Sequence, residues 1–65
     1  MLLAIDIGNT MVTIGVFKDT QLVTTMRTAS DSNRLPDEYG LILTNLLRLK
    51  GIEPTEITSI CTCSV

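Results

Sequence analysis

The sequence contains no tryptophan and no histidine, and it has one tyrosine, one phenylalanine and two cysteines in 65 residues. A nucleic-acid-binding surface needs a basic stripe with stacking rings, whereas five basic residues are scattered here among seven acidic ones, a net charge of −2. No apolar run approaches bilayer length, "MLLAI" is too short for a signal-peptide core, and two cysteines are too few for a disulfide scaffold or a zinc site. The composition therefore predicts a cytoplasmic protein with reduced thiols and with neither nucleic acid nor membrane as a partner.

What the chain does have is a hydrophobic content of 45% arranged in strand and helix patterns, as in a folded protein. Apolar residues occupy both alternating faces of residues 2–7, which predicts a strand central in a sheet and covered on both sides. Residues 11–18 and 21–28 are rich in β-branched residues, and short breaks with turn-forming residues separate the three segments. The pattern predicts an antiparallel meander of three strands.

A helix is predicted over residues 36–51. Asp37 and Glu38 lie in the first turn of this helix, at the positive end of the helix dipole. This position explains the acidic pair more simply than a role as paired catalytic acids. Gly51 ends the helix as a residue able to take positive φ. Leu35 stands at the cap position, where Ser, Thr or Asp would be stronger.

Residues 57–65 read as a fourth strand, in which Cys61 and Cys63 share one face. Free cysteine is among the most buried residue types, so both thiols are expected to be buried. One helix covers only one face of such a sheet, and an exposed apolar face is unfavourable. Residues 1–65 are therefore expected to be the N-terminal part of a larger α/β domain whose remainder lies beyond residue 65.

The stretch "IDIGNT", residues 5–10, places a carboxylate at the end of an apolar strand and directly before a turn. A lone buried carboxylate is costly, so Asp6 needs a partner or an exposed position. Mg²⁺ is typically held by one or two carboxylates together with nucleotide phosphates. Gly8 allows close backbone approach, the amides of the turn can converge on phosphate oxygens, and Asn9 and Thr10 add side-chain donors. The stretch predicts a polyphosphate site with its metal at Asp6.

The same residues have a plainer interpretation. Gly-Asn is an ordinary two-residue hairpin turn, an Asp near a turn often bonds only backbone amides, and D-x-G has many accidental matches. Gly15 is interpreted as a site of close packing or a bulge rather than as room for a ligand. Lys18, beside the next turn, is interpreted as a solvated lysine.

The motif D-I-G-N-T opening a β-hairpin resembles the first phosphate motif of the actin, sugar-kinase and heat-shock ATPase superfamily. Within it, the sequence most resembles the type III pantothenate kinases, and the resemblance implies a ribonuclease-H-like (actin-like ATPase) α/β fold. The similarity runs in one register through nearly the whole chain. It is carried by Asp6 to Thr10, Gly15 to Phe17, Arg27 and Thr28, the pair Ser30 and Asp31, and "DEYG" at residues 37–40.

The resemblance implies a homodimeric enzyme that phosphorylates pantothenate with ATP, the first step of coenzyme A biosynthesis, using Mg²⁺ and a monovalent cation, K⁺ or NH₄⁺. The general base, in a Gly-Xaa-Asp-Arg motif, would lie beyond residue 65, so no catalytic residue is assigned within residues 1–65 and the segment alone is expected to be inactive. Met11 stands where many members carry a polar residue, so a contact there would come from the backbone. The first ATP-binding segment would comprise Asp6 (also the metal ligand), Ile7, Gly8, Asn9, Thr10, Met11, Val12 and Thr13.

Two other functions fit the residues. One is a non-catalytic nucleotide-binding or regulatory module of the same superfamily, and the other is a small α/β interaction domain without a ligand. Loss of turnover after Asp6→Asn would favour the kinase, and unchanged kinetics would favour a structural Asp6.

Overall fold

The computed structural model describes residues 1–31 and 33–64, with only the backbone described at residue 64. Its elements follow the order strand, strand, strand, helix, short 3₁₀ helix, strand. They are β1 (Leu2–Ile7), β2 (Met11–Lys18), β3 (Gln21–Ala29), α1 (Pro36–Leu49), the 3₁₀ helix η1 (Pro54–Glu56) and β4 (Ser59–Ser64).

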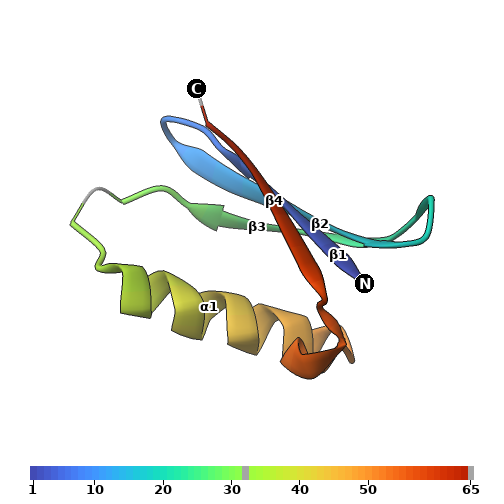
Figure 1. Cartoon of the computed structure of the whole chain (residues 1–65). Coiled ribbons are helices and arrows are strands. Elements are labelled where there is room, and N and C mark those ends of the chain that lie inside the picture. The colour runs from blue at the N-terminus through green and yellow to red at the C-terminus, as the bar shows by residue number, and fades with distance from the viewer. Residues whose placement is uncertain (32, 65) are drawn as a thin grey trace.

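The four strands form one mixed sheet in the order β3-β2-β1-β4. β1, β2 and β3 are antiparallel neighbours, whereas β4 returns after the helix and pairs with β1 in parallel. Helix α1 lies along one face of the sheet, and the turn between β1 and β2 lies at the same end of the sheet as the end of β4 (Figure 1). The prediction of a three-stranded meander, a helix and a fourth strand is confirmed. The fourth strand is shorter than the predicted 57–65, whose last residue lies outside the described part of the chain.

Helix α1 begins without a capping side chain and ends on a glycine. Leu35 at the N-cap is extended and makes no side-chain cap hydrogen bond, as its apolar side chain requires. At the other end, Gly51 has φ of 78° and donates its N–H to the Arg48 carbonyl over 3.0 Å, while the Ile52 N–H bonds the Leu47 carbonyl over 2.9 Å. This pair of bonds is a Schellman motif, and it ends the helix at Leu49, two residues before the predicted limit.

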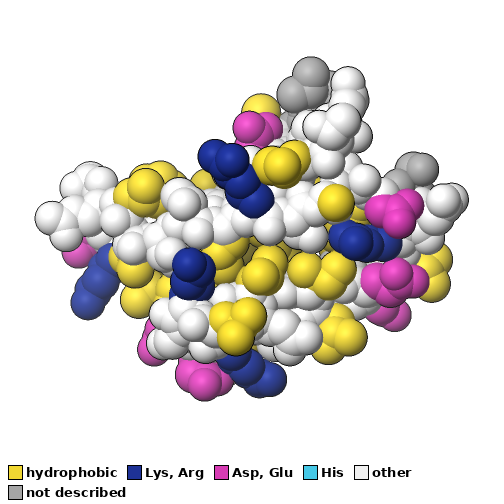
Figure 2. All heavy atoms as spheres, turned by 180° about the vertical axis from the view of Figure 1, so that it is seen from behind, with side chains coloured by type: hydrophobic (Ala, Val, Ile, Leu, Met, Phe, Trp, Pro, Cys, Tyr) yellow, Lys and Arg dark blue, Asp and Glu magenta, His cyan; other side chains and the backbone are white. Residues whose placement is uncertain are grey.

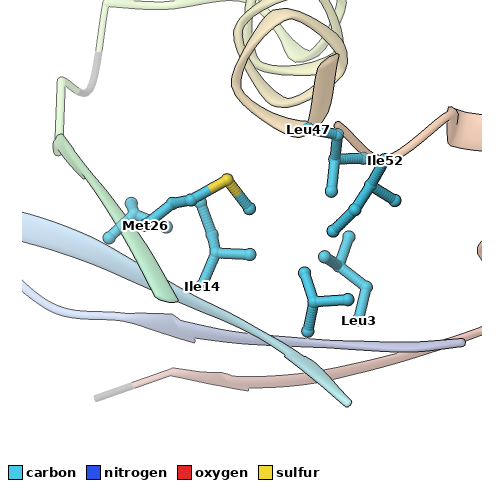
Figure 3. Close-up of a cluster of buried hydrophobic side chains, with 7 residues drawn as sticks. Leu3, Ile14, Met26, Leu47 and Ile52 are labelled. Atoms are coloured by element: carbon cyan, nitrogen blue, oxygen red, sulfur yellow. The ribbon is translucent and has the colours of Figure 1, made fainter. Parts of the chain in front are cut away.

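The core lies between the sheet and the helix. Side chains from β1, β2 and β3 point toward Leu47, in the last turn of the helix, and toward Ile52, just after the helix (Figure 3). Ile14 is at its centre with no exposed surface, between Ile5 and Met26 on the neighbouring strands. Burying each such side chain contributes about 1.5–3 kcal/mol. The buried set is Leu3, Val12, Ile14, Val16, Met26, Leu47 and Ile52.

The opposite face of the sheet is open in the described chain. It carries Ala4 and Asp6 of β1, and Asp6 is exposed. The central position predicted for residues 2–7 is confirmed, but only one face of that strand is covered by the helix. Gly15 also lies on the open face, where an added Cβ would come within 3.2 Å of the Phe17 ring and 3.5 Å of Leu22. Close packing is therefore its role, as predicted.

The prediction that both cysteines are buried is wrong, because Cys61 and Cys63 are free and exposed. Two features of the fold explain this. β4 is an edge strand, and its register with β1 places the two cysteines on the open face, beside Ala4 and Asp6. Local sequence does not encode either feature.

Hydrophobic side chains also reach the surface elsewhere, and they are visible between charged groups across the face seen in Figure 2. Leu49 at the end of the helix is 81% exposed, and Ile60 on the edge strand is 63% exposed. Within the described residues, α1 is too short and too polar to traverse a lipid bilayer.

Candidate functional site

Asp6 is the residue of β1 on the open face that lies nearest to the first turn. It is opposite Thr13 of β2 and beside Cys63 of β4, and Thr13 in turn is opposite Arg27 of β3. These four residues form a row across the sheet at the end that carries the first turn. Arg27 is two strands from Asp6, about 10 Å between the backbones. The row therefore places one carboxylate and one guanidinium on the same face without pairing them.

The turn after β1 is closed by one short backbone hydrogen bond. The Gly8 N–H donates to the Met11 carbonyl over 2.9 Å, with Asn9 and Thr10 as the two exposed residues between them. A Cβ at Gly8 would lie 3.0 Å from the Met11 oxygen, which is a backbone atom and cannot give way cheaply. Gly8 is thus needed for close approach of the backbone, and its φ is not in the left-handed region.

The amides of the turn differ in what they are free to bind. The Gly8 N–H is used inside the turn, so it is not free for an external acceptor. Among the groups that the structure describes, none accepts a hydrogen bond from the N–H of Asn9 or of Thr10. An anion at the turn would therefore be met by these two amides and by the side chains of the same residues.

The loop after β3 holds the turn in place. The Ser30 hydroxyl donates to the Gly8 carbonyl over 2.8 Å, and the Ser30 N–H donates to the Thr10 carbonyl over 3.1 Å. Sequence reasoning named Ser30 only as part of a family resemblance and gave it no role. A serine in a polar loop 22 residues away carries no local signal for this contact.

The remaining residues of the predicted segment support the turn rather than face it. Val12 is buried in the core, opposite Ile7 of β1, and Ile7 is partly exposed at the strand end. The Met11 side chain is 45% exposed, while its carbonyl closes the turn. Thr13 is the residue of β2 directly opposite Asp6, and it lies on the same face of the sheet. The structure thus brings together Asp6, the turn amides and Thr13 at one end of the open face.

The site contains a single carboxylate. No group of three or more His, Cys, Asp or Glu side chains that could enclose a metal ion occurs in the described part of the chain. An all-protein metal cage is thus not formed by these residues. One exposed hard oxygen donor does fit Mg²⁺, which keeps several waters and takes its other ligands from phosphates.

Two hollows flank this region. An open groove of about 450 Å³ starts at Asp6 and Thr13 and continues past Gly15 to Phe17 on the open face. A second hollow of about 500 Å³ lies on the helix side, between Ile5 and Tyr39. Only the first contains the carboxylate, and its position beside the turn makes it the relevant one despite its smaller volume.

The other candidates from the sequence lie away from this site. Asp37 and Glu38 are exposed in the first turn of α1, which fits their predicted role at the helix dipole. Lys18 is exposed beside the turn at the opposite end of the sheet, where Asp19 has φ of 57°.

Comparison with known proteins gives a consistent match. The sequence model described as type III pantothenate kinase matches residues 2–65. A type III pantothenate kinase of Moorella thermoacetica is 45% identical over 65 residues, covering 100% of this chain and 26% of that protein. The corresponding protein of Bifidobacterium longum (strain DJO10A) is 40% identical over 65 residues, 100% of this chain and 25% of its own length. That of Roseiflexus sp. (strain RS-1) is 51% identical over 57 residues, 88% of this chain and 22% of its own length. The chain thus spans about a quarter of the length of these curated relatives.

Proposed function

The chain belongs to the type III pantothenate kinase family, and on that basis we propose that the protein phosphorylates pantothenate with ATP, the first step of coenzyme A biosynthesis. Residues 6–13 are its phosphate- and metal-binding segment in this proposal. The observation that carries it is the exposed carboxylate of Asp6 beside a turn whose Asn9 and Thr10 amides are not used by the described chain.

Each residue of the segment has a part in the proposal. Asp6 holds Mg²⁺ directly or through water, and Mg²⁺, when bound, neutralises negative charge on the phosphates of ATP. Asn9 and Thr10 donate to phosphate oxygens, while Gly8 gives the turn its tight shape. Met11 contributes its backbone and not its exposed thioether. Ile7 and Val12 anchor the hairpin, and Thr13 flanks the carboxylate.

In phosphoryl transfer the protein acts mainly by positioning reactants and by electrostatic stabilisation. The segment is suited to that role, because Asp6 is fixed in the central strand of the sheet and the turn is fixed to the loop after β3. The general base belongs to the part of the enzyme beyond residue 65, and residues 1–65 alone are expected to be inactive.

The finer features of the proposal come from the family resemblance. They are a ribonuclease-H-like fold in which residues 1–65 are the N-terminal part, a monovalent cation (K⁺ or NH₄⁺), a homodimer and a cytoplasmic location. The order β3-β2-β1-β4, with β4 parallel to β1 after a helix, supports the fold. No described residue is assigned to the monovalent cation or to a dimer interface.

The test is a direct assay of the purified full-length protein with Mg-ATP and pantothenate. We expect formation of a phosphorylated pantothenate, detected by mass spectrometry, with ADP released in equal amount. Binding of Mg-ATP without transfer to pantothenate would overturn the kinase and favour the non-catalytic nucleotide-binding module. If the folded protein did not bind Mg-ATP, the result would favour the other alternative, a small α/β interaction domain that has no ligand.

A further inference from the structure

The loop after β3 contacts the turn through two groups of one residue. The hydroxyl and the backbone N–H of Ser30 bind the carbonyls of Gly8 and Thr10, over 2.8 Å and 3.1 Å. We propose that Ser30 is a positioning residue that aims the Asn9 amide at a phosphate oxygen of ATP. The proposal rests on the proposed function, since it names a residue that acts through the ligand-binding turn.

The argument follows from the planarity of the peptide bond. In a trans peptide the C=O and the following N–H point in opposite directions and lie in one plane. The Ser30 hydroxyl holds the Gly8 carbonyl toward the loop, so the Asn9 N–H of the same peptide must point away from it. The Ser30 N–H fixes the Thr10 carbonyl, and hence the peptide between Thr10 and Met11, in the same way. One serine therefore orients two peptides of the turn, the one between Gly8 and Asn9 and the one between Thr10 and Met11.

The loop itself is tied to the first turn of α1. The Tyr39 hydroxyl lies 3.0 Å from both the N–H and the carbonyl oxygen of Asp31, accepting from one and donating to the other. The Arg34 guanidinium donates to the Ala29 carbonyl over 3.0 Å and lies 5.7 Å from the centre of the Tyr39 ring. Since Asp31 is the neighbour of Ser30, these contacts fix Ser30 relative to the helix. The turn is thus held from outside its own hairpin.

A hairpin-forming turn does not need this second support. The turn already has its own closing bond from Gly8 to Met11, and the strands on either side pair in regular register. The bonds from Ser30 add orientation to peptides that are already in a hairpin. This is why the proposal predicts an effect on ligand binding beyond an effect on folding.

The experiment compares variants of the full-length protein. Ser30→Ala removes the hydroxyl, Ser30→Thr keeps it, and Tyr39→Phe removes the contact that holds Asp31. Thr44→Val is the matched control, because the Thr44 hydroxyl also donates to a carbonyl over 2.8 Å, that of Gly40, but within the helix. The measurements are the dissociation constant of Mg-ATP by calorimetry, the KM values for ATP and pantothenate, and the thermal midpoint.

We expect Ser30→Ala to weaken Mg-ATP binding about fivefold, equivalent to about 1 kcal/mol, the typical net value of one hydrogen bond. The KM for pantothenate should be unchanged, and Ser30→Thr should restore the affinity for ATP. Tyr39→Phe should weaken Mg-ATP binding about twofold, and Thr44→Val should leave it at the wild-type value. If Ser30→Ala and Thr44→Val lower the thermal midpoint equally, that loss reflects the removal of one hydrogen bond from the fold. Of these two variants, only Ser30→Ala should also lower the affinity for Mg-ATP.

Wild-type affinity for Mg-ATP in a folded Ser30→Ala protein would overturn the positioning role. Should Ser30→Ala fail to fold, Tyr39→Phe decides, and its wild-type affinity would overturn the role as well. If the wild-type protein bound Mg-ATP but did not phosphorylate pantothenate, the proposed function would be overturned. The dissociation constants of wild type and variants would still test the positioning role of Ser30. A wild-type protein that does not bind Mg-ATP would overturn both.

Discussion

The substitution Asp6→Asn in the full-length protein gives the sharpest test of the site. The side chain keeps its shape and loses its charge. Within the described part of the chain the Asp6 carboxylate makes no hydrogen bond or ion pair, and it is exposed. The free energy of unfolding should therefore change by no more than about 0.5 kcal/mol.

Catalysis should change much more. Two unit charges about 4 Å apart interact with about 4 kcal/mol at the effective dielectric of a protein surface. Mg²⁺ carries two charges, but solvent and an intervening water reduce the interaction, so about 3 kcal/mol is a reasonable net value. At 1.36 kcal/mol for each factor of ten, kcat/KM for ATP should fall by about two orders of magnitude.

The assay is steady-state kinetics at varied Mg-ATP, together with thermal unfolding. Asp19→Asn is the control, because Asp19 is an exposed aspartate in the turn at the opposite end of the sheet, and asparagine tolerates its φ of 57°. Asp19→Asn should leave kcat/KM within about twofold of wild type, as expected for a remote surface substitution. If Asp6→Asn retained kcat/KM within the same range as Asp19→Asn, the assignment of the metal to Asp6 would be refuted.

Three further predictions concern the full-length protein. Gly8→Ala should weaken Mg-ATP binding and lower stability by about 1 kcal/mol, because its Cβ would lie 3.0 Å from a backbone oxygen; calorimetry and thermal unfolding measure both, and unchanged values would contradict the tight turn. Gly51→Ala should destabilise by about 1–2 kcal/mol in urea unfolding, because of its φ of 78°. Gly40→Ala in the same helix has open space for its Cβ and should stabilise the protein by up to about 1 kcal/mol. Equal changes in the free energy of unfolding for Gly51→Ala and Gly40→Ala would contradict the Schellman motif at the end of α1. Ile14→Ala should cost about 2–5 kcal/mol in the same unfolding experiment, whereas Leu41→Ala, at a residue 64% exposed, should cost less than about 1 kcal/mol; similar losses would contradict the placement of the core.

The elements that the sequence predicted well are those with local causes. The end of α1 follows from Gly51, whose missing Cβ permits the left-handed backbone at that point. The missing cap at Leu35 was equally readable, since a leucine has no side-chain acceptor. The three-residue helix η1 was not predicted, although Pro54 at its start gave a weak signal. The exposure of Cys61 and the contact of Ser30 with Gly8 depend on which segments meet in space, and a single sequence does not state that.

The fold explains why the carboxylate and the turn occupy one place. β4 pairs with β1 in parallel, so both strands deliver their carboxyl ends to the edge of the sheet that also carries the first turn (Figure 1). In open α/β sheets, ligands bind outside the carboxyl ends of the strands. Ala4 is the preceding residue of β1 on the open face. A carboxylate there would lie beside Gly15 of β2 in the middle of that face, without turn amides near it. Two residues beyond Asp6, a carboxylate side chain at Gly8 would crowd the Met11 carbonyl oxygen, which closes the turn that supplies those amides. Position 6 therefore combines a rigid central strand with access to the turn, and a metal held there has room for waters and for phosphate oxygens.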